Sequence, residues 1–123
     1  MLRLLLDEGI APAVAIELRR RARGMVVYAL AEWEGGNFVG REDSDCLREA
    51  AVQELTLVTY DRSAISPILK EWIEEGIPHG GVIFVDEKTI SPAESGGLVS
   101  ALIALARQPG DWEWTNRVIF LRG

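Results

Sequence analysis

Short apolar runs alternate with segments of helical periodicity along the whole chain. The apolar runs occupy residues 2–6, 25–30, 55–60, 81–85 and 118–121. Their length and their wealth of Leu, Ile and Val are typical of parallel strands buried on both faces. Between them, apolar residues recur at helical spacing over about 12–22, from 43 onward, over 64–75 and over 92–107. This alternation predicts an α/β fold of three layers, in which helices cover both faces of a five-stranded parallel sheet.

Local signals mark the ends of several helices. Gly24 stops the helical pattern that starts near Pro12. Pro67 suits the first turn of the third helix, which we expect to begin near Ala64. The segment Ser91-Pro92-Ala93-Glu94 is a capping box, and it predicts that the fourth helix begins at Pro92.

Residues 31–43 predict a loop that is longer than most connections in a small domain. The segment holds three glycines together with Trp33 and Phe38, and long loops are usually functional or mobile. The two aromatic rings could stack on a nucleic-acid base, as they do in proteins that bind single strands. Packing against the body or against a second copy is the favoured interpretation.

Length and composition indicate one soluble domain, residues 1–123. The chain has 48% hydrophobic and 26% charged residues, which is ordinary for a globular protein and excludes a disordered one. Cys46 is the only cysteine, so an internal disulfide is excluded. The N-terminal residues lack the pattern of a signal peptide, and no apolar run is long enough to cross a bilayer. We therefore expect a cytoplasmic protein with no membrane partner.

The net charge of −6 argues against a protein that coats duplex DNA. This net charge is compatible with a local basic surface, and four arginines that could form one fall within residues 19–23. Arginine suits bidentate contacts with phosphate, so Arg19 and Arg20 are candidates for RNA binding. Cations at the end of a helix also complement its dipole, and this structural role is the favoured interpretation of the cluster.

Acidic residues follow three of the predicted strands. Asp7 and Glu8 follow the first, Asp61 follows the third and Asp86 follows the fourth. In open α/β sheets, ligands bind at the carboxyl edge, beside the point where the strand order reverses. Clustered carboxylates suit a hard divalent cation such as Mg²⁺ or Mn²⁺, with water completing the coordination. Such an ion can activate water and neutralise a phosphoryl transition state, as a phosphodiesterase or nuclease requires.

Three motifs together resemble the short PIN-like domains that are related to VapC toxin ribonucleases. They are Leu4-Leu5-Leu6-Asp7-Glu8, Ser44-Asp45 at the start of a helix, and Leu57-Val58-Thr59-Tyr60-Asp61. The resemblance implies a PIN-like sheet with the strand order 3-2-1-4-5, in which the first strand is central. It also implies that Asp7, Asp45 and Asp61 surround one pocket, bind Mg²⁺ or Mn²⁺ and hydrolyse RNA, with Glu8 as a further metal ligand.

The same resemblance implies supporting residues and partners. Thr59 matches the threonine that precedes the acid after the third strand, and Arg62 is a candidate for contact with RNA phosphates. The family commonly carries another acid two residues after Asp61, where this chain has Ser63. Serine could hold a metal-bound water but adds no charge. The implied partners are RNA and a cognate antitoxin protein, and a homodimer is compatible with the sequence.

The pattern leaves some alternatives open. Either Asp43 or Asp45 could face the pocket, and only the Ser-Asp pattern of the family favours Asp45. A phosphoacceptor domain similar to response-regulator receivers ranks lower, because such domains need a lysine after the last strand, where this chain has Arg122. A third alternative is a non-catalytic PIN-like interaction module. It is motivated by Ser63, which stands where the family commonly has an acid.

Overall fold

Five parallel strands form one sheet in the computed structural model, which describes residues 2–108 and 113–123. The strands are β1 (Arg3–Leu6), β2 (Val26–Ala29), β3 (Thr56–Thr59), β4 (Val82–Val85) and β5 (Val118–Leu121). The helices are α1 (Pro12–Arg21), α2 (Asp43–Val52), α3 (Arg62–Glu75) and α4 (Ser95–Ala106), with a short 3-10 helix η1 (Trp33–Gly36). The α/β class expected from the sequence is confirmed. In the part of the chain that is described, no helix combines the length and apolarity needed to cross a membrane.

The strands lie in the order β2-β1-β3-β4-β5, and every neighbouring pair is parallel. The order 3-2-1-4-5 expected from the PIN-like resemblance therefore has to be corrected: β3, not β1, is the central strand. All four residues of β3 are buried, as an interior strand requires. The exposed side chains belong instead to the two border strands, with Tyr28 on β2 and with Val118 and Phe120 on β5.

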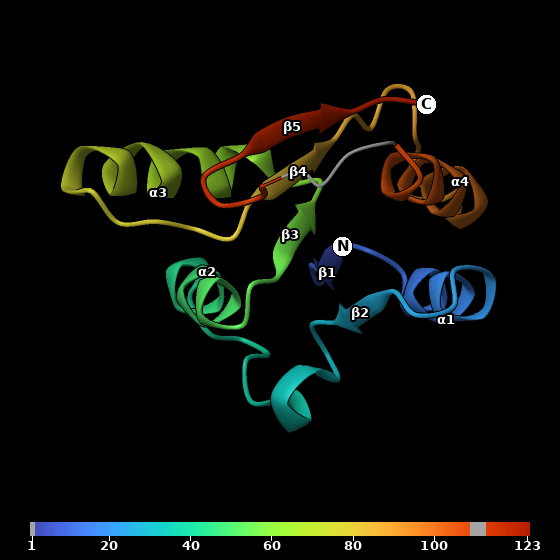
Figure 1. The fold of residues 1–123 in the computed structure, drawn as a ribbon, viewed down its shortest axis with the longest axis horizontal. Coiled ribbons are helices and arrows are strands. Elements are labelled where there is room, and N and C mark those ends of the chain that lie inside the picture. The colour runs from blue at the N-terminus through green and yellow to red at the C-terminus, as the bar shows by residue number, and fades with distance from the viewer. Residues whose placement is uncertain (1, 109–112) are drawn as a thin grey trace.

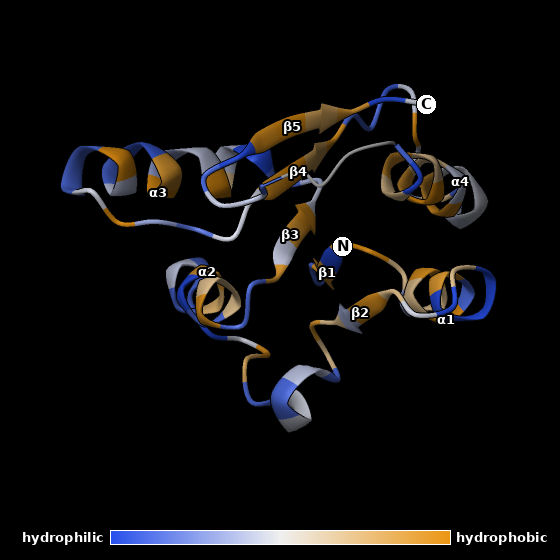
Figure 2. Cartoon of the chain, viewed as in Figure 1, coloured by the Kyte–Doolittle hydropathy of each residue, from blue (hydrophilic) through white to orange (hydrophobic). Residues whose placement is uncertain are grey.

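Two helices cover each face of the sheet, as Figure 1 shows. Helices α1 and α4 pack together on one face, over residues such as Leu4, Leu6 and Val58. Helices α2 and α3 cover the other face, where Leu5 and Leu57 lie. The strand residues alternate between these two cores because successive side chains point to opposite faces. Figure 2 shows hydrophobic residues along β4 and β5 and hydrophilic residues on the outer side of α1.

The starts of α3 and α4 differ from the expected positions. Helix α3 begins at Arg62 because the Asp61 side chain caps it, so Pro67 lies inside the helix and not in its first turn. Helix α4 begins at Ser95, three residues after the predicted start. The Ser91 hydroxyl accepts a hydrogen bond from the amide of Ala93 (3.2 Å), which makes a local turn in place of the capping box.

The loop after β2 is held to the body by its aromatic residues. Trp33 is buried, its ring centroid lies 4.7 Å from that of Phe38, and its indole nitrogen donates a hydrogen bond to Gln53 Oε1 (3.2 Å). The expectation that these rings pack the loop against the body is confirmed. Trp33 is too deeply buried to stack on a base.

Candidate functional site

The acidic residues that follow β1 and β3 meet at the carboxyl edge of the sheet. After β1 the chain passes to β2 on one side, and after β2 it crosses to β3 on the other side of β1. The strand order therefore reverses between β1 and β3, and such a reversal leaves a ligand-binding crevice at the carboxyl ends of the two strands. Asp7 follows β1 directly, and its amide donates a hydrogen bond to Val58 O of β3 (3.0 Å). Asp61 lies two residues beyond the end of β3.

Thr59 links these two acids. Its hydroxyl donates a hydrogen bond to Asp7 Oδ2 (2.7 Å) and accepts one from the amide of Asp61 (3.0 Å). The Thr59 side chain is fully buried. The other oxygen of Asp7 accepts a hydrogen bond from the amide of Glu8 (2.8 Å). Both oxygens of Asp7 are thus fixed by donors, which keeps the carboxylate oriented in the crevice.

Asp61 is held by the start of α3. Its Oδ1 accepts hydrogen bonds from the amide of Ala64 (3.1 Å) and from the hydroxyl of Ser63 (3.1 Å). Ser63, which stands where the PIN-like domains that the sequence resembles have an acid, therefore serves to fix Asp61. Oδ2 of Asp61 has no hydrogen-bond partner among the described residues. This oxygen is available to a ligand.

The effect of the neighbouring acids on its pKa identifies Asp43 as the third acid of the crevice. It opens α2, yet neither it nor the N-cap residue Glu42 makes a side-chain capping bond. Burial raises the pKa of the Asp43 carboxyl above its usual value, and the negative charges of three other acids raise that pKa further. These acids are Asp7, Asp61 and Glu8. The first turn of α2 therefore places one of its aspartates among the acids of the carboxyl edge.

Asp45, the predicted ligand on this helix, is paired with cations. Its carboxylate oxygens lie 3.6 Å from a nitrogen of Arg41 and 3.9 Å from a nitrogen of Arg48. Its role in metal binding remains a prediction, and the charges of the neighbouring acids, which raise the pKa of Asp43, favour Asp43 for that role. The sequence contained the relevant signal, two aspartates separated by one serine, but the periodicity of so short a segment could not decide which one faced the crevice.

The negative field of the crevice also reaches Cys46. This cysteine is buried and lies near the carbonyl oxygen of Phe38 (Sγ to O, 3.9 Å). Burial raises the pKa of the Cys46 thiol to about 11, with further contributions from the charges of Asp43 and Asp7. The thiol stays protonated near neutral pH, so it is a core residue and not a nucleophile.

Two further acids border the crevice. Glu8 is exposed, and its Oε1 accepts a hydrogen bond from the amide of Gly40 (3.3 Å), which ties the loop after β2 to the site. Asp86 follows β4 and lies 4.0 Å from Arg122 Nε. Asp86 and Arg122 line a pocket of about 400 Å³ at the same edge, together with Arg62 and Lys88. The guanidinium of Arg62, a predicted RNA contact, lies 4.8 Å from the centroid of the Phe120 ring in this pocket, whose lining does not include Asp7, Asp61 or Asp43.

The other two predicted RNA contacts are engaged elsewhere. Arg19 donates hydrogen bonds to Val27 O (2.7 and 3.1 Å) and pairs with Glu32. Arg20 pairs with Glu17 at 2.8 Å on the exposed side of α1. Both lie in the later part of α1, whereas the acids are near its start. Their contact with RNA stays a prediction, and each already has a structural partner.

The acids do not form a tight cage. Within residues 2–108 and 113–123, no three His, Cys, Asp or Glu side chains lie close enough together to hold one ion. Mg²⁺ usually takes only one or two carboxylates directly and keeps several waters. Carboxylate oxygens such as those of Asp7 and Asp61 suit an ion of this kind only where one or two of them bind it directly and water completes its coordination.

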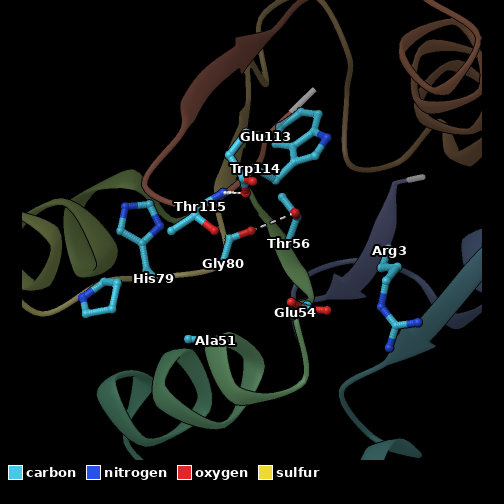
Figure 3. Close-up of a pocket in the computed structure, with 10 residues that line it drawn as sticks. Arg3, Ala51, Glu54, Thr56, His79, Gly80, Glu113, Trp114 and Thr115 are labelled. Atoms are coloured by element: carbon cyan, nitrogen blue, oxygen red, sulfur yellow. Dashed lines mark hydrogen bonds between the residues drawn. The ribbon is translucent and has the colours of Figure 1, made fainter. Parts of the chain in front are cut away.

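A second pocket, of about 380 Å³, lies at the opposite edge of the sheet and is drawn in Figure 3. It contains His79, which is buried and accepts a hydrogen bond from the amide of Gly81 on Nδ1 (3.0 Å). Burial lowers the pKa of this imidazole, so it remains neutral near pH 7. Thr56 donates to Gly80 O (2.9 Å) in the same region. The structural role expected for His79, at the edge away from the acids, agrees with this geometry.

The three acids and Thr59 define a candidate site from geometry and charge alone. Their positions follow from two strand ends and one helix start. Comparison of the chain with protein-family models, with curated proteins and with solved structures gave no match. The resemblance to PIN-like domains therefore stays a prediction.

Proposed function

We propose that this protein is a Mg²⁺- or Mn²⁺-dependent hydrolase of phosphodiester bonds in RNA, similar to PIN-like toxin ribonucleases. The observation that carries the proposal is the set of acids at the strand-order reversal. Thr59 orients Asp7 toward the crevice, Asp61 keeps one oxygen free, and both acids raise the pKa of Asp43. Carboxylates that repel one another are stabilised by a divalent cation.

Asp7, Asp61 and Asp43 would hold the cation partly through water, and the ion would supply an activated water and neutralise charge on the scissile phosphate. The chain's own residues orient these ligands. The hydroxyl of Thr59 fixes Asp7, and the N-terminal turn of α3 fixes Asp61. Preorganised donors of this kind lower the cost of assembling the site.

RNA is the proposed substrate because the PIN-like ribonucleases that the sequence resembles cleave RNA, and because the acidic chain still carries basic groups on local surfaces. Arg62, Lys88 and Arg122 line the pocket that follows β4 at the carboxyl edge, and their cations are the proposed contacts for RNA phosphates. The choice of RNA over other nucleic acids and the cognate antitoxin partner rest on the family resemblance alone. They are part of the proposal as expectations to be tested.

The first test is calorimetric titration of the protein with Mg²⁺ and Mn²⁺, followed by cleavage assays on single-stranded RNA. We expect Asp7→Asn, Asp61→Asn and Asp43→Asn each to weaken metal binding at least tenfold and to abolish cleavage, because each removes a ligand charge. Asp45→Asn is the matched control on the same helical turn and should retain both properties. Unchanged metal-dependent cleavage in Asp7→Asn would refute the proposal. An absence of metal binding in the native protein would favour the non-catalytic interaction module.

One observation favours a second candidate, a receiver-like phosphoacceptor domain. The order β2-β1-β3-β4-β5 is the doubly wound order that such domains have, and Asp61 follows β3 as their acceptor does. Against it, Arg122 stands where a lysine is needed. Mass spectrometry after incubation with acetyl phosphate and Mg²⁺ separates the two candidates. Phosphorylation of the native protein but not of Asp61→Asn would support the receiver, and no mass change would exclude it.

A further inference from the structure

The two border strands differ in how their outer edges are satisfied. In a parallel pair, alternate residues turn their backbone N–H and C=O groups toward the neighbouring strand. The amide of Leu30 bonds to Leu6 O, so the even-numbered residues of β2 face β1. Val27 and Ala29 therefore direct their backbone groups to the outer edge of the sheet.

The outer edge of β2 is covered by an ion pair. Arg19 donates two hydrogen bonds to Val27 O (2.7 and 3.1 Å), and Glu32 Oε1 accepts one from the amide of Ala29 (3.2 Å). Arg19 and Glu32 also pair with each other. This arrangement satisfies the groups that could otherwise recruit another strand, which is how natural sheets protect their borders.

The outer edge of β5 has no such cover. The amides of Val82 and Asp86 bond to the carbonyl oxygens of Arg117 and Leu121 (both 2.9 Å), so the odd-numbered residues of β5 face β4. Val118 and Phe120 direct their backbone groups outward. Among residues 2–108 and 113–123, no group forms a hydrogen bond with them. Figure 1 shows β5 at the border of the sheet opposite to β2.

An apolar groove runs beside this open edge. The side chains of Phe120 (52% exposed) and Val118 (38%) form it together with Ile73 of α3 (73%). Its volume is about 350 Å³. Three charged residues of α3 also line the groove. Arg62 places its guanidinium 4.8 Å from the centroid of the Phe120 ring, and Lys70 and Glu74 lie one helical turn apart. Exposed apolar side chains next to unpaired backbone groups are typical of an interaction surface.

We propose that a second copy of this chain covers the edge, with the two β5 strands antiparallel across a two-fold axis at Ile119. Val118 then lies opposite Phe120 of the second copy, and the reverse pair forms as well, so all the outward backbone groups of both residues are satisfied. The two five-stranded sheets become one continuous sheet. The proposal concerns assembly and does not depend on the proposed hydrolase activity.

Two features favour a second copy over another partner. The outward groups of β5 are symmetric about Ile119, so one edge can serve both sides of an isologous interface. The opposite charges of Lys70 and Glu74 in the groove are also self-complementary. When two α3 helices approach in antiparallel orientation, Lys70 of one copy faces Glu74 of the other, and like charges are not opposed.

Light scattering after size exclusion tests the interface. We expect the native protein to be a dimer. Val118→Pro removes an outward amide without breaking a bond to β4, and proline is tolerated at the first residue of an edge strand. This variant should be a monomer, whereas Val118→Ala, which keeps the amide, should stay a dimer. Phe120→Lys, a second disrupting variant, should also be a monomer with a native circular dichroism spectrum.

A disulfide test checks the register. The antiparallel arrangement places Ile119 opposite its own copy as a non-hydrogen-bonded pair, with Cα atoms about 4.5 Å apart, which a disulfide can span. Ile119→Cys should cross-link under mild oxidation, and Val118→Cys should not. The native Cys46 is buried, so we expect it to form no intermolecular disulfide of its own. A native monomer, a dimeric Val118→Pro variant or a failure of Ile119→Cys to cross-link would each overturn the proposal.

Discussion

Thr59 holds the candidate site together, because one hydroxyl serves both Asp7 and the amide of Asp61. Thr59→Val keeps the shape of the side chain and removes these bonds. We expect a loss of about 0.5–1.5 kcal/mol in the free energy of unfolding, since the half-buried Asp7 carboxylate and the amide of Asp61 each lose a hydrogen-bond partner. Urea unfolding measures this loss. Thr59→Ser, which keeps the hydroxyl, is the control, and equal stability of the Val and Ser variants would contradict the role of the hydroxyl.

Asp43 makes the metal-free protein less stable as its carboxyl ionises. Its pKa is raised in the fold by burial and by the charges of other acids. The folded state therefore binds the proton more tightly than the unfolded chain, and stability falls as pH rises from the ordinary Asp pKa to the raised one. Asp43→Asn should be more stable than the native protein at pH 7, by up to about 1 kcal/mol. The difference should vanish at lower pH.

Asp45→Asn provides the control for this prediction. It lies in the same first turn of α2, so it loses the same favourable interaction with the helix dipole. It also loses its exposed pairs with Arg41 and Arg48. Thermal unfolding at several pH values should show no gain for Asp45→Asn. If both variants behaved alike at pH 7, Asp43 would not belong to the acidic set.

Helix α3 depends on the same residue that is proposed to bind metal. Asp61 caps the helix through its bond from the amide of Ala64. Asp61→Ala should lower the free energy of unfolding by about 0.5–2 kcal/mol, whereas Asp61→Asn keeps a capping oxygen and should cost little. Both should lose metal binding. Denaturant unfolding in the absence of metal separates the two effects, and equal stability of the variants would show that the cap contributes nothing.

The pattern of apolar residues was sufficient to predict the elements, because buried strands and amphipathic helices have distinct periods. It could not set helix starts that depend on one side-chain bond, such as the cap from Asp61 or the turn at Ser91. The pattern of apolar residues also could not predict the order of the strands in the sheet. The interior strands β1, β3 and β4 all have buried apolar residues at their centre, so β1 and β3 could not be ranked from their own sequences. The carboxyl-edge acids Asp7 and Asp61 could be predicted because any parallel order directs them to one edge.

The molecule as a whole has one protected border and one open border. The Arg19–Glu32 pair covers β2, while Val118 and Phe120 leave β5 uncovered within the described chain. A parallel sheet with two open borders could add strands without limit, whereas one open border allows only a closed pair. Protection of a single edge therefore favours a dimer over a fibre.

Removal of the β2 cover should then open a second interface. The double variant Arg19→Ala with Glu32→Ala frees Val27 O and the amide of Ala29, and we expect assemblies larger than the native one, measured by light scattering. Glu17→Ala with Arg20→Ala removes a pair of the same charges from the exposed side of α1 and should not change the mass. The two variants also separate two roles for the basic cluster. Weaker RNA binding in both would indicate phosphate contact, whereas association in the first alone would show that Arg19 protects the edge.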